Sequence, residues 1–338
     1  MSQRPVRPRL VDELGRQQSL PNDAEAFQAL LQGGKDHTNS AASRQTAPSR
    51  VLFLGLGPDP TVPLALAHGA ADVAYLESPD FVRQMPPGWA AAIPADWTSL
   101  SAEAPLSDPQ LREALADPHR PRVWLYAPGP RLFPGFWGPV LGWLRAQTLP
   151  SPGPRTSSPL VLLPGREDQL LARELAAGFF AVGATARRIP PPTGPDAAAR
   201  LLAETRPALY FSVNFTGLDP QGEIFHLLDA AGVAVAVWCV DNPWHLLSGL
   251  KSPFWQRAAL CVTDDSFLPG LRAHGATRVA HLPLAAWPEL MTPRSDSATP
   301  RETTPRPALN VIHDPPALRD GDVAGRRVFV GRTAFPGR

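Results

Sequence analysis

Polar side chains stand at the ends of several apolar runs in the second half of the chain. They are Asn214, Asp241, Asn242, His245, Asp264 and Asp265, and the runs before them are 208–213, 233–240 and 258–262. Continuous apolar runs of this length are typical of strands buried on both faces of a parallel sheet. Ligands of such sheets bind beyond the carboxyl ends of the strands. We therefore expect Asp241 or His245 to act as a general base on a substrate hydroxyl. Asn214, Asn242 and Asp264 are predicted to bind the substrate.

The same residues also have a purely structural interpretation. Asp241 and Asn242 can cap the turn and the next helix, and Asp264 with Asp265 can cap a helix that starts at Ser266. His245 can simply pack beside its neighbours, and Asn214 can bond to its own loop. Paired acids can bind a metal, but no third ligand stands at a recognisable spacing, so no metal site is assigned.

A second group of residues is typical of a nucleotide-binding turn. Gly55 and Gly57 follow the apolar run 50–54, and Glu77 ends the next predicted strand, 72–76, after a helix predicted at 61–69. Glycines in such a turn let a phosphate approach the backbone, and an acid at this position can bind ribose hydroxyls. The arrangement resembles the first motif of Rossmann-like methyltransferases, which implies S-adenosylmethionine or a nucleotide as a cofactor. The alternative is that the glycines only turn the chain.

The order of the predicted elements indicates an α/β protein with two Rossmann-like parallel-sheet domains. The predicted segments are a flexible arm at 1–48 with one short helix at 23–31, a domain at 49–150, a linker at 151–158, a domain at 159–289, a linker at 290–307, and the start of an incomplete C-terminal domain at 308–338. The domain at 159–289 has six predicted strands that alternate with helical segments, which is the pattern of parallel crossovers. In the first domain, 122–126 is a further strand and 136–146 a helix.

Composition excludes several classes of protein. With 43% hydrophobic residues the chain can bury a sizeable core, and its net charge of +1 gives no field that favours nucleic acid. The N-terminus lacks the apolar stretch of a signal peptide, and no apolar run is long enough for a transmembrane segment. Cys239 and Cys261 lie in predicted buried strands, where free thiols are expected. These features predict a cytoplasmic protein.

Four segments of the second domain carry a resemblance to a known family. They are LYFSVNFTG (209–217), VAVAVWCVDNPWHLL (233–247), LCVTDDSFLPGLRAHG (260–275) and VAHLPLAAWPE (279–289). In order and spacing they resemble the N-terminal, acceptor-side domain of CgeB or spore-protein-like glycosyltransferases of the GT-B type. RVFVG (327–331) resembles the strand that opens the nucleotide-sugar domain.

The resemblance implies sugar transfer from a nucleotide-sugar donor to a small-molecule, glycan or protein acceptor, without an obligatory metal. Most donor-binding residues of such enzymes lie in the C-terminal domain, of which this chain holds at most the first strand. A non-catalytic protein that binds a glycan or a partner therefore stays an alternative, beside the cofactor-binding one.

Overall fold

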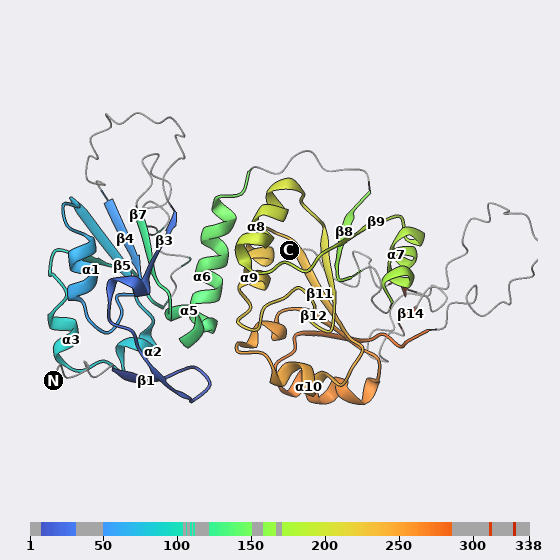
Figure 1. Cartoon of the computed structure of the whole chain (residues 1–338). Helices are drawn as coiled ribbons and strands as arrows, with labels where there is room; N and C mark the ends of the chain where they lie inside the picture. Colours follow the sequence, from blue (N-terminus) through green and yellow to red (C-terminus); the bar gives the residue numbers. More distant parts are fainter. Residues whose placement is uncertain are drawn as a thin grey trace, which may run out of the picture. The chain divides into compact units, whose positions relative to one another are not determined.

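The structure is a computed structural model that describes residues 8–31, 50–103, 106, 109, 111, 122–150, 158–166, 171–285, 311–312 and 327–328 (Figure 1). The chain divides into two compact units, unit 1 from Met1 to Val140 and unit 2 from Leu141 to Arg338. The division falls within helix α6 (Pro134–Gln147), before the linker predicted at 151–158. Residues 151–157 of that linker and all of the predicted linker at 290–307 lie outside the described residues.

Unit 1 is built on a five-stranded sheet with the order β3-β7-β4-β5-β6. Its strands are β3 (Phe27–Leu31), β4 (Arg50–Leu54), β5 (Asp72–Leu76), β6 (Thr98–Ser99) and β7 (Arg122–Tyr126). β3 pairs antiparallel with β7, and the other neighbours are parallel. From β4 to β7 the order is that of the first four strands of a doubly wound Rossmann sheet, as the fold class predicts. Three predicted strands, 50–54, 72–76 and 122–126, have the predicted bounds.

Short helices connect these strands. They are η1 (Ala24–Ala26), α1 (Thr61–Leu66), α2 (Pro79–Val82), α3 (Gly88–Ala91), α5 (Gly129–Leu132) and the first part of α6. Proline stands in the first turn of α2 and of α5, where the missing N–H costs no intrahelical bond. The helices predicted at 61–69 and 136–146 are found, the first shorter and the second slightly longer than predicted.

Residues 8–31 differ from the flexible arm and the helix expected there. β1 (Arg9–Val11) and β2 (Gln17–Ser19) form an antiparallel hairpin, in which the Asp12 carboxylate accepts from the Arg16 amide at 2.8 Å. The helix predicted at 23–31 is wrong, because only η1 is helical and the chain then enters β3. The reason is tertiary: β3 pairs with β7 along Phe27–Leu31, with one irregularity between Ala29 and Leu31, and this pairing outweighs the weak local preference for helix.

Unit 2 contains a six-stranded, all-parallel sheet with the order β13-β12-β11-β10-β8-β9. Its strands are β8 (Leu160–Pro164), β9 (Thr185–Ile189), β10 (Leu209–Val213), β11 (Ala234–Cys239), β12 (Ala259–Val262) and β13 (Arg278–His281). They correspond to the six strands predicted in the domain at 159–289, which confirms the second Rossmann-like sheet. If these six strands are numbered 1 to 6 along the chain, their order across the sheet is 2-1-3-4-5-6. The direction of winding therefore reverses between β8 and β10.

Helices cover the two faces of this sheet unequally. They are α7 (Ala172–Ala181), α8 (Pro195–Glu204), α9 (Glu223–Ala230), α10 (Pro243–Ser248), η3 (Pro253–Gln256), η4 (Asp265–Phe267) and α11 (Leu268–Ala273). Side chains of α8, α9, α10 and α11 pack on one face, and those of α7 pack on the other. We call the second face the α7 face. α7 begins at Ala172, and residues 167–170 before it lie outside the described part.

The two cysteines lie on opposite faces of the sheet. Cys239 in β11 packs among the residues under α8 to α11, and Cys261 in β12 packs on the α7 face. Both are free and buried, as expected, and burial raises the pKa of the Cys239 thiol to about 12. Neighbouring strands therefore do not bring the two sulfur atoms into a geometry for a disulfide.

Little of the C-terminal segment is described. β14 (Val311–Ile312) pairs antiparallel with β15 (Arg327–Val328), and the rest of the predicted incomplete domain lies outside the described residues. Of the helices within the described ranges, none combines the length and the apolarity that crossing a bilayer requires.

Candidate functional site

Asn214 and Asp241 meet at the carboxyl edge of the unit 2 sheet. Asn214 follows β10 and Asp241 follows the neighbouring β11, and Asn214 Nδ2 donates to Asp241 Oδ2 at 2.8 Å. The other side of the amide accepts, since Asn214 Oδ1 takes hydrogen bonds from the backbone amides of Val240 at 2.8 Å and Asp241 at 3.3 Å. One asparagine side chain thus fixes both the backbone and the carboxylate at the end of β11. The Asp241 carboxylate is exposed and can meet a ligand.

The loop after β10 is held in an unusual backbone conformation. Asn214 has φ of 51° and Phe215 has φ of 61°, so two consecutive residues other than glycine occupy the left-handed region. Each such residue costs on the order of 1–3 kcal/mol and persists only where its surroundings impose it. Two contacts hold the loop in this conformation. The Ser212 hydroxyl donates to the Thr216 carbonyl at 2.8 Å, and the buried Phe215 side chain packs in the core. Strain of this kind is concentrated at functional sites.

The other predicted residues of this edge have mixed roles. Asn242 caps α10, because its Oδ1 accepts from the Trp244 amide at 2.9 Å, and Asp264 caps η4 by accepting from the Ser266 amide at 2.9 Å. Hydrogen bonds from Ser266 hold the pKa of Asp264 below its usual value. His245 lies exposed in α10. The capping interpretation therefore holds for Asn242 and Asp264, and their exposed oxygens keep further lone pairs toward solvent.

A small cavity lies where the winding of the sheet reverses. It is lined by the ends of β8, β9 and β10 and by the first turn of α7, through Leu163, Pro164, Gly165, Arg166, Ala172, Leu175, Arg188, Phe211 and Val213. Its volume is about 20 Å³. We call it the crevice cavity. Because Val213 immediately precedes Asn214, the crevice cavity adjoins the Asn214–Asp241 pair along the edge. This is the position where open α/β sheets bind their ligands.

Sequence reasoning missed the arginines of this cavity and one histidine. Arg166 comes two residues after the end of β8 and Arg188 lies in β9. His281 ends β13, with Nε2 3.1 Å from the Thr263 carbonyl oxygen at the neighbouring strand end. The available signal was position: Arg166 and His281 both stand at the carboxyl end of a predicted strand.

In unit 1 the predicted nucleotide-binding residues hold one another. Glu77 Oε2 accepts from the Leu56 amide and Oε1 from the Ser78 amide, both at 2.8 Å, so the carboxylate bonds to the turn between Gly55 and Gly57. Glu77 is 6% exposed, and this burial raises the pKa of its carboxyl to about 7. In this arrangement a cofactor could reach the carboxylate only after the turn opens.

The two glycines are required by close packing as well as by their backbone. Gly55 and Gly57 have φ of +85° and +68°, which favours glycine. A Cβ at Gly55 would lie 2.9 Å from Tyr126 Cβ, and one at Gly57 would lie 3.0 Å from Tyr126 Cε2. The Trp89 indole donates to the Gly57 carbonyl at 2.9 Å. The space that a phosphate would use in a nucleotide-binding fold is thus occupied by aromatic side chains.

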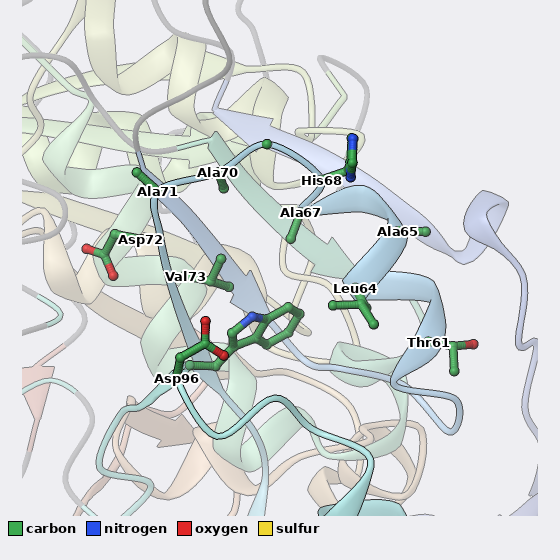
Figure 2. A pocket seen from close by; sticks show the side chains of 12 residues that line it. Thr61, Leu64, Ala65, Ala67, His68, Ala70, Ala71, Asp72, Val73 and Asp96 are labelled. Carbon is green, nitrogen blue, oxygen red and sulfur yellow. The ribbon is translucent and has the colours of Figure 1, made fainter.

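A larger hollow of unit 1 lies away from this turn. It has a volume of about 540 Å³ and is formed by α1, the loop that follows it, the start of β5, and Asp96 with Trp97 (Figure 2). It lies at the amino end of β5, whereas Glu77 follows the carboxyl end. Its lining includes several alanines, and Trp97 stacks on Phe53 with ring centroids 5.5 Å apart. None of the predicted site residues line it.

Two further findings bear on the site. Across the described ranges, no three His, Cys, Asp or Glu side chains come close enough together to hold a metal ion. A comparison of the sequence with models of known protein families found no match, and a comparison with curated proteins found none either.

Proposed function

We propose that unit 2 is the acceptor-side domain of a GT-B-like glycosyltransferase, in which Asp241 removes the proton from an acceptor hydroxyl. The observation that carries the proposal is the exposed Asp241 carboxylate, oriented by Asn214 at the carboxyl edge of a six-stranded parallel sheet. A general base needs a fixed position and access to the substrate, and Asp241 has both. The strained loop at Asn214 and Phe215 adds support, because backbone strain is concentrated where chemistry needs it.

His245 and Asn242 complete the proposed site. His245, which is exposed and lies four residues after Asp241, serves as the alternative base, and Asn242 and Asp264 offer their remaining lone pairs to sugar hydroxyls. The donor is a nucleotide sugar, which the family that unit 2 resembles binds mainly with its second domain. As in that family, the proposal assigns no obligatory metal.

The test is sugar transfer by the full chain, assayed with nucleotide sugars as donors. Asp241→Asn keeps the shape and an oxygen that can accept from Asn214, but it cannot take a proton, so turnover should fall about a hundredfold or more. Asp265→Asn, an exposed carboxylate at the same edge, is the matched control and should stay close to the wild type. Retained turnover in Asp241→Asn removes Asp241 from the mechanism, and the same result in His245→Ala removes His245.

A second candidate is cofactor binding by unit 1, and one observation favours it. The Ser78 hydroxyl, beside Glu77, is 1% exposed and has no hydrogen-bond partner in the described part of the chain. A buried unpaired hydroxyl is costly, and a ligand that displaced the Glu77 contacts would give it a partner. Calorimetry of the full chain with S-adenosylmethionine and with ATP tests this candidate. Absence of binding heat for both ligands rejects it.

A further inference from the structure

Positive side chains border the crevice cavity of unit 2. Arg166 follows β8, and Arg188 lies opposite Leu163 in the register of β8 and β9. Side chains alternate along a strand, and Ile189 packs on the face covered by α8 to α11. Arg188 therefore lies on the α7 face together with Leu163, and Arg187 lies on the other face. Arg166, after the end of β8, and Arg188, in the neighbouring β9, thus both line one small cavity.

The start of α7 adds to the positive potential there. α7 has 10 residues, and Ala172 and Leu175 of its first turn line the crevice cavity. Its N-cap is Leu171, which has no side-chain acceptor, so the first amides of the helix receive no side-chain cap. Helix N-termini of this kind favour anions. Glu174, the acid in the first turn, is not among the residues that line the cavity.

We propose that the crevice cavity binds an oxyanion group of the acceptor, a phosphate or a carboxylate, between Arg166 and Arg188. The inference rests on the proposed function and names its substrate class. Arginine matches such groups because its planar fork donates two parallel hydrogen bonds. Each guanidinium carries five N–H donors, so it can bind an oxyanion and keep a contact within the protein.

The geometry of the sheet also limits the size of the acceptor. The cavity of about 20 Å³ has room for about one water molecule, so a single oxygen atom of the anion enters it and the rest of the group lies at its mouth. β10 lies between β8 and β11, and neighbouring strands are about 4.8 Å apart. The anionic group, between the ends of β8 and β9, and the Asp241 carboxylate, after β11, are therefore separated by two to three strand spacings, or about 10–14 Å. The acceptor carries its reacting hydroxyl within about that distance of its charge.

Binding of simple anions to the full chain tests the proposal without any turnover. Inorganic phosphate and acetate are titrated by calorimetry at constant ionic strength, and the stronger of the two identifies the class of oxyanion. Arg166→Gln and Arg188→Gln should each weaken binding about tenfold, because a hydrogen bond between charged groups contributes at least that factor. Arg187→Gln, one residue away on the opposite face, should bind like the wild type. The affinity of Arg188→Lys for the anion should lie between those of the wild type and Arg188→Gln, since lysine keeps the positive charge but cannot donate two parallel hydrogen bonds.

Three outcomes overturn the proposal. They are no saturable binding of either anion, equal weakening in Arg187→Gln, and unchanged binding in both Arg166→Gln and Arg188→Gln. Circular dichroism checks that each variant is folded, and Arg188→Lys replaces Arg188→Gln if the latter is not. Asp241→Asn should bind the anion normally. Failure of the catalytic proposal therefore shows in turnover alone, whereas failure of this proposal shows in anion binding.

Discussion

The buried carboxyl of Glu77 should make the stability of unit 1 fall as the pH rises. Two backbone amides, from Leu56 and Ser78, donate to it, yet burial outweighs them and raises its pKa from 4.5 to about 7. Between pH 4.5 and about pH 7, Glu77 keeps its proton in the folded state but has released it in the unfolded state. Stability from this group is therefore complete below about pH 4.5 and is lost as the pH rises through about 7.

The magnitude follows from the two pKa values. At about 1.4 kcal/mol for each pH unit, the interval from 4.5 to about 7 corresponds to about 3 kcal/mol. Glu77→Gln removes the titration but puts an amide nitrogen opposite one of the donating N–H groups. One hydrogen bond is then lost, which costs about 1–3 kcal/mol. We expect Glu77→Gln to be less stable than the wild type at pH 5 and to match or exceed it at pH 8.

The measurement must report unit 1 alone. Urea unfolding of the full chain at pH 5, 6, 7 and 8, followed by pulsed hydrogen exchange and mass spectrometry, isolates peptides that contain β4 and β5. Glu25→Gln, which changes an exposed carboxylate in η1 of the same unit, is the control and should follow the wild type. Parallel stability curves for the wild type and Glu77→Gln would refute the reasoning, because the burial of Glu77 would then have no energetic consequence.

Two further predictions concern unit 2. Gly142→Ala should destabilise unit 2 by about 1–3 kcal/mol, because the added Cβ would lie 2.5 Å from the backbone carbonyl carbon of His226. Gly178→Ala in α7 is the control: its Cβ would meet nothing within 4 Å, so the variant should be neutral or slightly stabilised, and the urea midpoints of the two variants are compared. His226 is buried, which lowers its pKa from 6.5 to about 4, so unit 2 should lose about 3 kcal/mol as the pH falls from 6.5 to 4. Hydrogen exchange of β11 peptides measures the loss, and a His226→Gln variant with the same acid sensitivity as the wild type would contradict the assignment.

The parallel strands could be predicted because their signal is local. A buried parallel strand must be apolar on both faces, and the runs in the sequence report this directly, as for Arg50–Leu54 and Arg122–Tyr126. β3 could not be predicted in the same way. Its partner β7 lies about a hundred residues further along the chain, and Phe27 pairs with Tyr126. Pairing at that distance leaves no periodic signal within a short window of sequence.

The candidate site was predictable in part for the same reason. Parallel strands bring their carboxyl ends to one edge, so the meeting of Asn214 and Asp241 follows from recognising β10 and β11. The crevice cavity required the strand order, which decides where the winding reverses and is a tertiary property. The position of Arg166 after a predicted strand was visible in the sequence, but its place beside Arg188 at the reversal was not. Likewise the spacing of Gly55, Gly57 and Glu77 predicted a turn followed by an acid. That the Glu77 carboxylate bonds to the turn, and that Tyr126 and Trp89 pack against it, depends on contacts between residues far apart in the sequence.

The pairing of β3 with β7 also sets the order of events during synthesis. β4 and β5 can pair as soon as residue 76 has left the ribosome, but β3 has no neighbour until β7 emerges at residues 122–126. Until then Phe27 has no Tyr126 to pack on, and the turn at Gly57 lacks the Tyr126 ring that packs against it. A nascent chain arrested before residue 122 therefore carries an incompletely covered glycine turn and an unpaired N-terminal strand, and unpaired strand edges of this kind favour aggregation.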